Sequence, residues 1–198
     1  MTILQAIRPA LVLVAVFTLL TGLALPLGFV GLAGAVAPGA AGGSLVQRDG
    51  IVVGSALIGQ SFTSPRYFAG RPSATTAADP ADPTQQVPTP YNAAASLASN
   101  YGATNAALVD RVREGIAGAG PAPVPGDAVT ASASGLDPHI SPATALRQML
   151  RVAAARNLPE ERVRALLAEH TEGRLLGLVG EPRVNVLRLN LALDAAAR

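Results

Sequence analysis

The N-terminal part of the chain has a long stretch without charge, which strongly limits how it can fold. No charged side chain occurs between Pro9 and Gln47, and the residues at 9–30 (PALVLVAVFTLLTGLALPLGFV) are almost wholly apolar. A helix needs about 20 such residues to cross the hydrocarbon core of a bilayer. We therefore predict a transmembrane helix over residues 9–31, which leaves residues 1–8 as a short N-terminus.

The charges that flank this helix indicate its orientation. Arg8 and the free amino group precede it, and the next charges, Arg48 and Asp49, neutralise each other. The positive-inside rule then predicts a cytoplasmic N-terminus in a single-pass protein of the plasma (inner) membrane. Residues 32–43 are rich in Gly and Ala and are expected to form a flexible neck. Residues 44–198 would form an extracytoplasmic domain.

A cleaved signal peptide is the alternative interpretation of the apolar stretch. Residues 35–37 (AVA) fit a small-residue cleavage site. The apolar stretch, however, exceeds the roughly 7–15 residues of a typical signal-peptide core, which favours a retained anchor. Both interpretations place the remainder of the chain outside the cytoplasm.

Composition excludes several kinds of site. The chain contains no cysteine, and all 15 of its basic residues are arginine. Disulfides, thiolate nucleophiles and catalytic lysines are therefore absent. The arginines are interleaved with acidic residues along the chain instead of gathering in one segment. This pattern argues against a nucleic-acid partner.

The domain is expected to be α+β, with a mostly antiparallel sheet and about three helices. Asp49-Gly50 predicts a tight hairpin within residues 44–55, and the prolines between 62 and 90 predict a long irregular segment. Alternating leucines predict a late strand at 184–193, which would form one sheet with the hairpin. Helices are predicted at 104–116, at 141–156 with Leu146, Met149, Leu150 and Ala153 facing inward, and after a capping box at 157–160 with Val163, Leu166 and Leu167 inward.

A polar cluster within residues 129–141 raises the question of catalysis. Ser134, Asp137 and His139 are the residue types of a hydrolytic triad, and Ser132 lies close by in sequence. No glycine lies two residues before Ser134, so the nucleophile-elbow pattern is missing. Turn formation and backbone capping by these side chains is the simpler interpretation. The two histidines of the chain lack the spacing of a metal site.

A second cluster combines arginines with aromatic residues. Arg66, Tyr67, Phe68 and Arg71 follow one another closely in the irregular segment. Arg and Tyr are favoured in protein interfaces, and Arg can also bind phosphate or carboxylate groups. Contact with a protein partner is the favoured interpretation, and internal packing and the binding of a small anion are alternatives.

Four blocks of the chain point to a known family: LIGQSFTSPRYFAGRPSA at 57–74, PVPGDAVTASASGLDPHIS at 123–141, RVAAAR at 151–156 and RVNVLRLNLAL at 183–193. Together they resemble the C subunit of the bacterial Kdp potassium-transporting P-type ATPase. The resemblance extends over almost the whole chain and includes the single N-terminal anchor. One departure follows Tyr91-Asn92, where the family tends to have Ser-Gly-Gly-Ser-Asn-Leu and this chain has SLASNY at 96–101.

The resemblance implies a non-catalytic accessory subunit of a high-affinity, ATP-driven potassium-uptake complex. Its implied partners are a channel-like potassium-binding subunit, a catalytic P-type ATPase subunit, a small single-span subunit and the lipid bilayer. ATP and potassium are then expected to act in the complex, with no cofactor held by this chain. The implied role is to stabilise assembly and to assist nucleotide use by the catalytic subunit. Arg66, Tyr67, Phe68, Arg71, Ser134, Asp137 and His139 are the expected partner contacts, and a membrane-anchored or secreted serine hydrolase is the alternative function.

Overall fold

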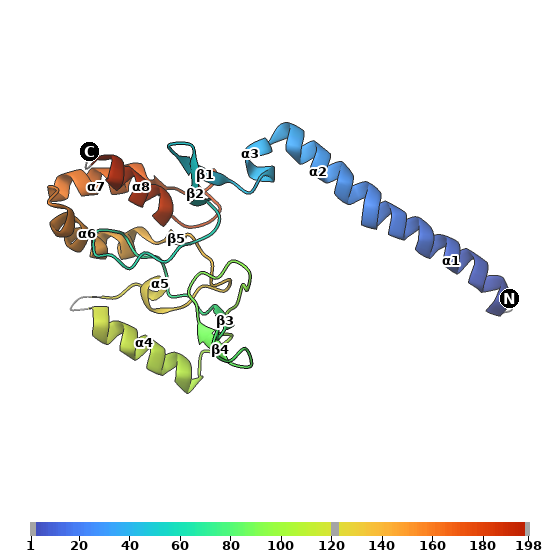
Figure 1. The fold of residues 1–198 in the computed structure, drawn as a ribbon, viewed down its shortest axis with the longest axis horizontal. Helices are drawn as coiled ribbons and strands as arrows, with labels where there is room; N and C mark the ends of the chain where they lie inside the picture. Colours follow the sequence, from blue (N-terminus) through green and yellow to red (C-terminus); the bar gives the residue numbers. More distant parts are fainter. Residues whose placement is uncertain (1–2, 120–122, 197–198) are drawn as a thin grey trace. The chain divides into compact units, whose positions relative to one another are not determined.

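A computed structural model describes residues 3–119 and 123–196 of the chain. The chain divides into two compact units, residues 1–45 and 46–198. The first unit is helical and the second contains strands and helices (Figure 1). A single-helix anchor with a small α+β domain, as expected, is confirmed.

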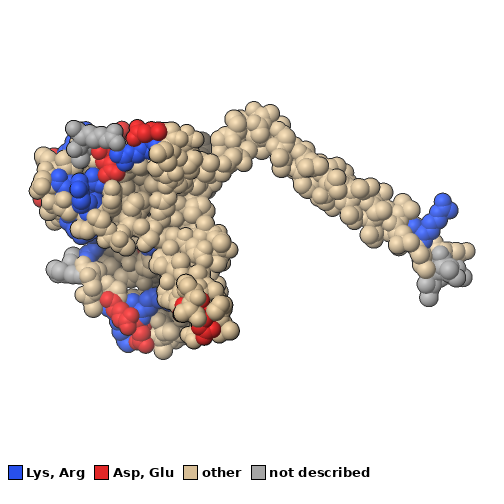
Figure 2. Space-filling view, viewed as in Figure 1, with Lys and Arg blue, Asp and Glu red and all other residues tan. Residues whose placement is uncertain are grey.

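The N-terminal unit is one long apolar helix followed by a short helical turn. In the described part of the chain, one helix is long and apolar enough to cross a membrane, and it extends over Gln5–Val36 with a mean hydropathy of 2.4. None of its residues is buried, and Figure 2 shows charged atoms only near its N-terminal end. The helix continues past residue 31, so residues 32–36 of the expected neck are helical. Its segments are α1 (Ile3–Leu19), η1 (Leu20–Ala24), α2 (Leu25–Val36) and the separate α3 (Pro38–Ala41).

A widened turn lies in the middle of the long helix. Pro26 has no amide hydrogen, and its ring would clash with the carbonyl one turn earlier in a regular α-helix. The five-residue π-helical segment η1 directly precedes α2, which has this proline in its first turn. The Thr21 hydroxyl donates a hydrogen bond of 2.6 Å to the carbonyl of Phe17. The helix therefore passes the proline without ending.

The second unit begins with the predicted hairpin. Strand β1 (Leu45–Arg48) pairs with β2 (Ile51–Ser55) in a two-stranded sheet. Asp49 and Gly50 both have positive φ angles, 53° and 79°. These values are typical of the type I′ turn that the Asp-Gly pair predicts, so this element is confirmed.

The proline-rich segment contains one more hairpin than predicted. Strands β3 (Thr76–Ala78) and β4 (Gln86–Pro88) pair antiparallel, with Ala77 opposite Val87. Pro88 lies at the end of its strand, where the lack of an amide hydrogen is tolerated. The rest of residues 62–90 is irregular, as expected.

The predicted helices form, although one of their caps differs from expectation. Ser141 caps α6 by accepting a 3.1 Å hydrogen bond from the amide of Thr144. The predicted capping box at 157–160 is wrong, because Asn157 adopts a left-handed conformation that closes α6 and Pro159 precedes α7 without a side-chain cap. The helices of this region are α4 (Ala106–Ala119), the short α5 (Gly126–Val129), α6 (Pro142–Arg156) and α7 (Glu160–Glu169).

The predicted late strand is mostly a helix. Only Arg183–Asn185 form a strand, β7, and Val186–Ala196 form helix α8. The Asn185 side chain accepts a 3.1 Å hydrogen bond from the amide of Arg188 and so caps the new helix. The buried positions of α8 recur at helical spacing, which the alternating leucines concealed. They are Val186, Leu187, Leu189, Asn190 and Leu193.

The expected single sheet is also wrong. Strand β7 lies between β5 (His139–Ile140) and β6 (Thr171–Glu172) in a three-stranded antiparallel sheet. The β1–β2 hairpin forms a sheet of its own. Strand β7 is short, and β5 and β6 pair along its two edges, so neither edge is left for the hairpin.

The core lies where α6, α7, α8 and β7 meet. Val163, Leu166 and Leu167 are buried as predicted, and so are Met149 and Ala153. The inward positions predicted for Leu146 and Leu150 are wrong, because these side chains are 44% and 56% exposed. The buried face of α6 instead contains Thr144, Ala145, Met149, Val152, Ala153 and Arg156.

Candidate functional site

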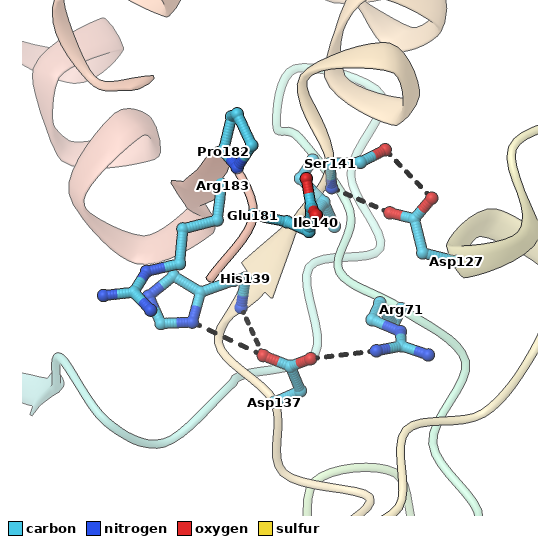
Figure 3. A pocket seen from close by; sticks show the side chains of 9 residues that line it. All are labelled: Arg71, Asp127, Asp137, His139, Ile140, Ser141, Glu181, Pro182 and Arg183. Carbon is cyan, nitrogen blue, oxygen red and sulfur yellow. Dashed lines mark hydrogen bonds and ion pairs between the residues drawn. The ribbon is translucent and has the colours of Figure 1, made fainter. Parts of the chain in front are cut away.

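The segment between α5 and β5 folds through its own polar side chains. The Ser134 hydroxyl accepts a 3.1 Å hydrogen bond from the amide of Leu136, and Asp137 accepts one of 3.0 Å from the amide of His139. Gly135 has a φ of 68°, which disfavours other residues. These turns confirm that the polar side chains of the cluster hold the local backbone. They also place the side chains of Asp137 and His139 next to each other (Figure 3).

Asp137 lies at the centre of this group. Its carboxylate accepts a 3.1 Å hydrogen bond from the Arg71 guanidinium, and the Nδ1 atom of His139 lies 3.4 Å from its other oxygen (Figure 3). Partial burial raises the pKa of Asp137, but the hydrogen bonds from His139 and Arg71 outweigh burial and hold the pKa below its usual value. Asp137 is therefore a charged group with its charge balanced by Arg71.

An open pocket of about 400 Å³ is lined by this group, by residues of α5 and β5, by the residue that caps α6 and by the segment that leads into β7. Figure 3 labels its nine lining residues. Asp127 accepts hydrogen bonds from the amide and the hydroxyl of Ser141, at 2.7 and 2.9 Å, and so supports the start of α6. Arg183 pairs with Glu172 at 2.9 Å. The charges around the pocket are thus largely balanced within the chain.

The geometry does not assemble a hydrolytic triad. Ser134 lines a neighbouring pocket of about 490 Å³, whereas His139 lines the pocket described above. The two pockets share Arg71 and Asp137. Across residues 3–119 and 123–196, no hydrogen bond joins Ser134 to His139, and the Ser134 hydroxyl accepts from Leu136. Within the same residues, no group of three His, Asp or Glu could hold a metal ion.

The Arg66–Arg71 cluster is mainly structural. Phe68 is completely buried in the core, so its predicted role as a partner contact is wrong. Its amide and carbonyl are both hydrogen-bonded by the Asn190 side chain, at 2.9 and 3.0 Å. Gln148 forms the equivalent pair of bonds with Ala69, at 2.8 and 3.0 Å. Side-chain amides from α8 and α6 thus hold this irregular segment as a neighbouring strand would.

A charged network lies next to this segment. Asp194 accepts hydrogen bonds from Arg156 at 2.8 Å, from Arg48 at 2.9 Å and from the Tyr67 hydroxyl at 3.2 Å. The Arg156 side chain is 1% exposed, lies 4.8 Å above the Tyr67 ring and donates to the carbonyl of Arg66 at 2.6 Å. Sequence reasoning missed Asn190 and Asp194. Had α8 been recognised as a helix, these two polar residues, four positions apart on a mostly apolar helix, would have pointed to the network.

Tyr91 connects the Arg66–Arg71 segment with the group around Asp137. Its hydroxyl donates a 2.7 Å hydrogen bond to the carbonyl of Arg71, and its ring lies against Gly59 and Gly70. Burial, with a smaller contribution from the charge of Asp137, raises the pKa of Tyr91 to about 12. Tyr91 is therefore a neutral, half-buried wedge that holds Arg71 next to Asp137.

Of the sequence-predicted residues, the structure brings together Arg71, Asp137 and His139. The Arg66 side chain lies elsewhere on the surface, Tyr67 belongs to the Asp194 network, and Ser134 lies in the neighbouring pocket. These residues therefore form a polar feature of the surface whose charges are balanced within the chain. Within the described residues they do not assemble a catalytic group.

Comparison with known proteins identifies the family. The model of the KdpC family, described as the c chain of the K⁺-transporting ATPase, matches residues 7–195. The potassium-transporting ATPase KdpC subunit of Rhodopseudomonas palustris is 61% identical over 197 residues, which cover 98% of this chain and 99% of the relative. The KdpC subunit of Methylobacterium nodulans is 62% identical over 198 residues, 98% of each chain. The chain therefore belongs to the KdpC family, the c chains of K⁺-transporting ATPases.

Proposed function

We propose that this chain is a non-catalytic, single-span accessory subunit that stabilises a potassium-uptake complex. In this complex it would hold a channel-like potassium-binding subunit and the catalytic P-type ATPase subunit together, beside a small single-span subunit. The observation that carries the proposal is the fully exposed apolar helix at Gln5–Val36. A lone span with no buried residue needs lipid or other membrane helices around it.

A catalytic role of its own is disfavoured by the residues present. A P-type phosphorylation motif requires Asp-Lys-Thr-Gly, and the chain has no lysine. A single helix cannot enclose an ion path. The separation of Ser134 from His139 into neighbouring pockets further disfavours the serine hydrolase alternative.

In the proposed topology, ATP and potassium are used by the complex as a whole and are not bound by this chain alone. With Arg8 on the cytoplasmic side, the domain would lie outside, on the side of the plasma membrane opposite to ATP. Assistance to nucleotide use would then act through assembly and the membrane helix, without direct contact between the domain and ATP. The half-buried groups around the pocket, Arg71, Asp137 and His139, are proposed to face the channel-like subunit near its potassium entrance. Ser134 and Arg66 are further surface candidates, and Tyr67 contributes only its exposed part.

The second half of the span offers a surface for helix packing. Gly28, Gly31 and Ala35 fall on one face of α2, and no atom lies within 4 Å of where a Cβ would be at either glycine. Small residues on one face let another membrane helix approach closely, so that dispersion contacts hold the pair. We propose that this face of α2 packs against a membrane helix of a partner subunit.

The variants Gly28→Leu and Gly31→Leu test this proposal. Each should lower the amount of this chain that co-purifies with a tagged ATPase subunit by about tenfold, or about 1.4 kcal/mol, because a leucine holds the two helices apart. Val30→Phe, which adds bulk to the opposite face of α2, serves as the control and should co-purify normally. Normal co-purification of both glycine variants would contradict the proposed packing face.

A further inference from the structure

A separate pocket of about 380 Å³ lies between α4, the β3–β4 hairpin and the segment at 97–101. Both pockets around Asp137 contain carboxylates, which balance the arginines there. Among the described residues that line this third pocket, by contrast, the one charged side chain is that of Arg111. We call it the Arg111 pocket, and its lining carries a net positive charge.

Arg111 has an aromatic neighbour and no counter-charge. Its guanidinium lies 5.2 Å from the centre of the Tyr101 ring. Across residues 3–119 and 123–196, no carboxylate forms an ion pair with it, and the adjacent Asp110 is paired with Arg113 at 3.3 Å. A ring face stabilises the charge of a guanidinium but does not replace the hydrogen bonds that an anion accepts from it. Arg111 therefore retains donors for a ligand.

The other polar groups of the pocket are either used inside the chain or free. The Thr75 hydroxyl donates a 2.6 Å hydrogen bond to the carbonyl of Thr89, so it forms part of a fixed wall. The hydroxyls of Ser99 and Tyr101 have no hydrogen-bond partner in the part of the chain that the structure describes. Two hydroxyls that can donate thus accompany a guanidinium that can only donate. Such a set of groups matches a negatively charged acceptor.

The helix that presents Arg111 is fixed at both ends. The Asn105 side chain accepts a 2.8 Å hydrogen bond from the amide of Ala107 and so caps the start of α4. Arg147 of α6 donates a 2.6 Å hydrogen bond to the carbonyl of Ala119, the last residue of α4. Because the helix is already held in place, a ligand would pay little for ordering this side of the pocket.

The size of the pocket indicates more than a single ion. A cavity of about 380 Å³ lies in the range of sites for small organic molecules. Part of its wall is apolar, because Pro88 and Leu97 line it. A ligand that fits this wall has an apolar part as well as its charged group.

We propose that the Arg111 pocket binds a small organic anion. Its carboxylate or phosphate group would accept hydrogen bonds from the Arg111 guanidinium, whose planar fork suits both kinds of oxyanion. The Ser99 and Tyr101 hydroxyls would donate to the same group, and the apolar part would lie against Leu97. This site goes beyond the proposed function, because anion binding here requires no other subunit.

Titration calorimetry of the full-length chain in detergent tests the proposal with phenyl phosphate, benzoate and the neutral benzyl alcohol. Both anions should bind, and benzyl alcohol should bind about tenfold more weakly or not at all, because it lacks the charge that pairs with Arg111. The tighter of the two anions shows whether phosphate or carboxylate fits better. In NMR spectra, the ring signals of Tyr101 should shift on binding, whereas those of Tyr67 and Tyr91, which do not line the pocket, should not.

Variants assign the binding to individual side chains. Arg111→Gln should weaken the binding of phenyl phosphate by about tenfold, and Arg111→Lys, which keeps the charge but loses the fork, should weaken it less. Ser99→Ala leaves the contact between Arg111 and Tyr101 intact and should weaken binding by a smaller factor. Arg113→Gln removes an exposed positive charge from the same helix and is the matched control, which should bind as wild type does. Thermal unfolding without probe establishes that each variant is folded.

Four results would overturn the proposal. They are no binding of either anion at millimolar concentration, equally tight binding of benzyl alcohol, unchanged binding by folded Arg111→Gln, and an equal loss in Arg113→Gln. The last result would show that the anions respond only to the general surface charge. None of these results bears on the assembly of the complex, so the proposed function stands or fails separately.

Discussion

Replacing Asp194 with alanine is expected to destabilise the domain by about 3–5 kcal/mol. Its carboxylate balances the charge of Arg156, whose side chain is 1% exposed, and it also accepts from Arg48 and the Tyr67 hydroxyl. Without Asp194, the Arg156 guanidinium would be a buried charge with no counter-charge. Urea unfolding of the full-length chain in detergent, followed through the tertiary signal of the domain, measures the loss.

An exposed ion pair provides the control. Asp110 and Arg113 pair at 3.3 Å on α4, where both side chains are mostly exposed. Asp110→Ala should change the free energy of unfolding by no more than about 1 kcal/mol, because exposed pairs contribute little. An Asp194→Ala variant as stable as Asp110→Ala would contradict the role given to the buried network.

The stabilisation by Asp194 should also depend on pH. Burial raises the pKa of Asp194, but the hydrogen bonds from Arg156 and Arg48 outweigh burial and lower the pKa below its usual value. A carboxyl with a lower pKa in the folded state stabilises the fold fully above the unfolded pKa of about 3.9, and this contribution is lost as the pH falls through the folded pKa. The stability difference between wild type and Asp194→Ala should therefore be constant near neutral pH and shrink in acid.

The variant Gly59→Ala is expected to destabilise the domain by about 3 kcal/mol, at the upper end for added bulk in a packed site. A Cβ at this position would meet the ring of Tyr91 and lie 2.7 Å from the carbonyl oxygen of Asp137. The amide of Gly59 is held at 2.8 Å by the carbonyl of Leu136, so the backbone cannot move away without losing that bond. The displaced Tyr91 would in turn release Arg71. Thermal unfolding of the full-length chain would detect the change.

Gly118→Ala is the matched control for Gly59→Ala. Gly118 lies in α4, and no atom lies within 4 Å of where its Cβ would be. Alanine there should stabilise the chain by about 0.5–1 kcal/mol, because it favours the helical backbone. The two substitutions add the same methyl group. Changes in the free energy of unfolding of similar size and sign would therefore contradict the close packing described at Gly59.

Elements specified by local chemistry could be predicted from the sequence. The Asp49-Gly50 turn depends on two positive φ angles, and the start of α6 depends on the Ser141 cap and the following proline. The membrane helix depends only on a long apolar stretch. Each of these signals lies within a few residues of the element that it predicts.

Features that depend on tertiary contacts could not be predicted in the same way. The leucines from 187 to 193 alternate as in a strand, yet the buried side of α8 is completed by Asn190, which binds the backbone of Phe68 from 122 positions away. The prediction that Phe68 is a surface contact was wrong for the same reason, because its burial depends on residues that are distant in the sequence. The ion pair between Arg71 and Asp137 could not be predicted either, because it depends on the Tyr91 side chain, which lies between Gly59 and Gly70.

Under the proposed function, this chain stabilises a potassium-transporting assembly without catalysing a reaction itself. The most direct measurement is to purify the complex through a tagged ATPase subunit from cells with and without this chain, and to assay potassium-stimulated ATP hydrolysis. We expect the channel-like subunit and the potassium-stimulated activity to co-purify only when this chain is present. Normal assembly and normal activity in its absence would contradict the proposed function.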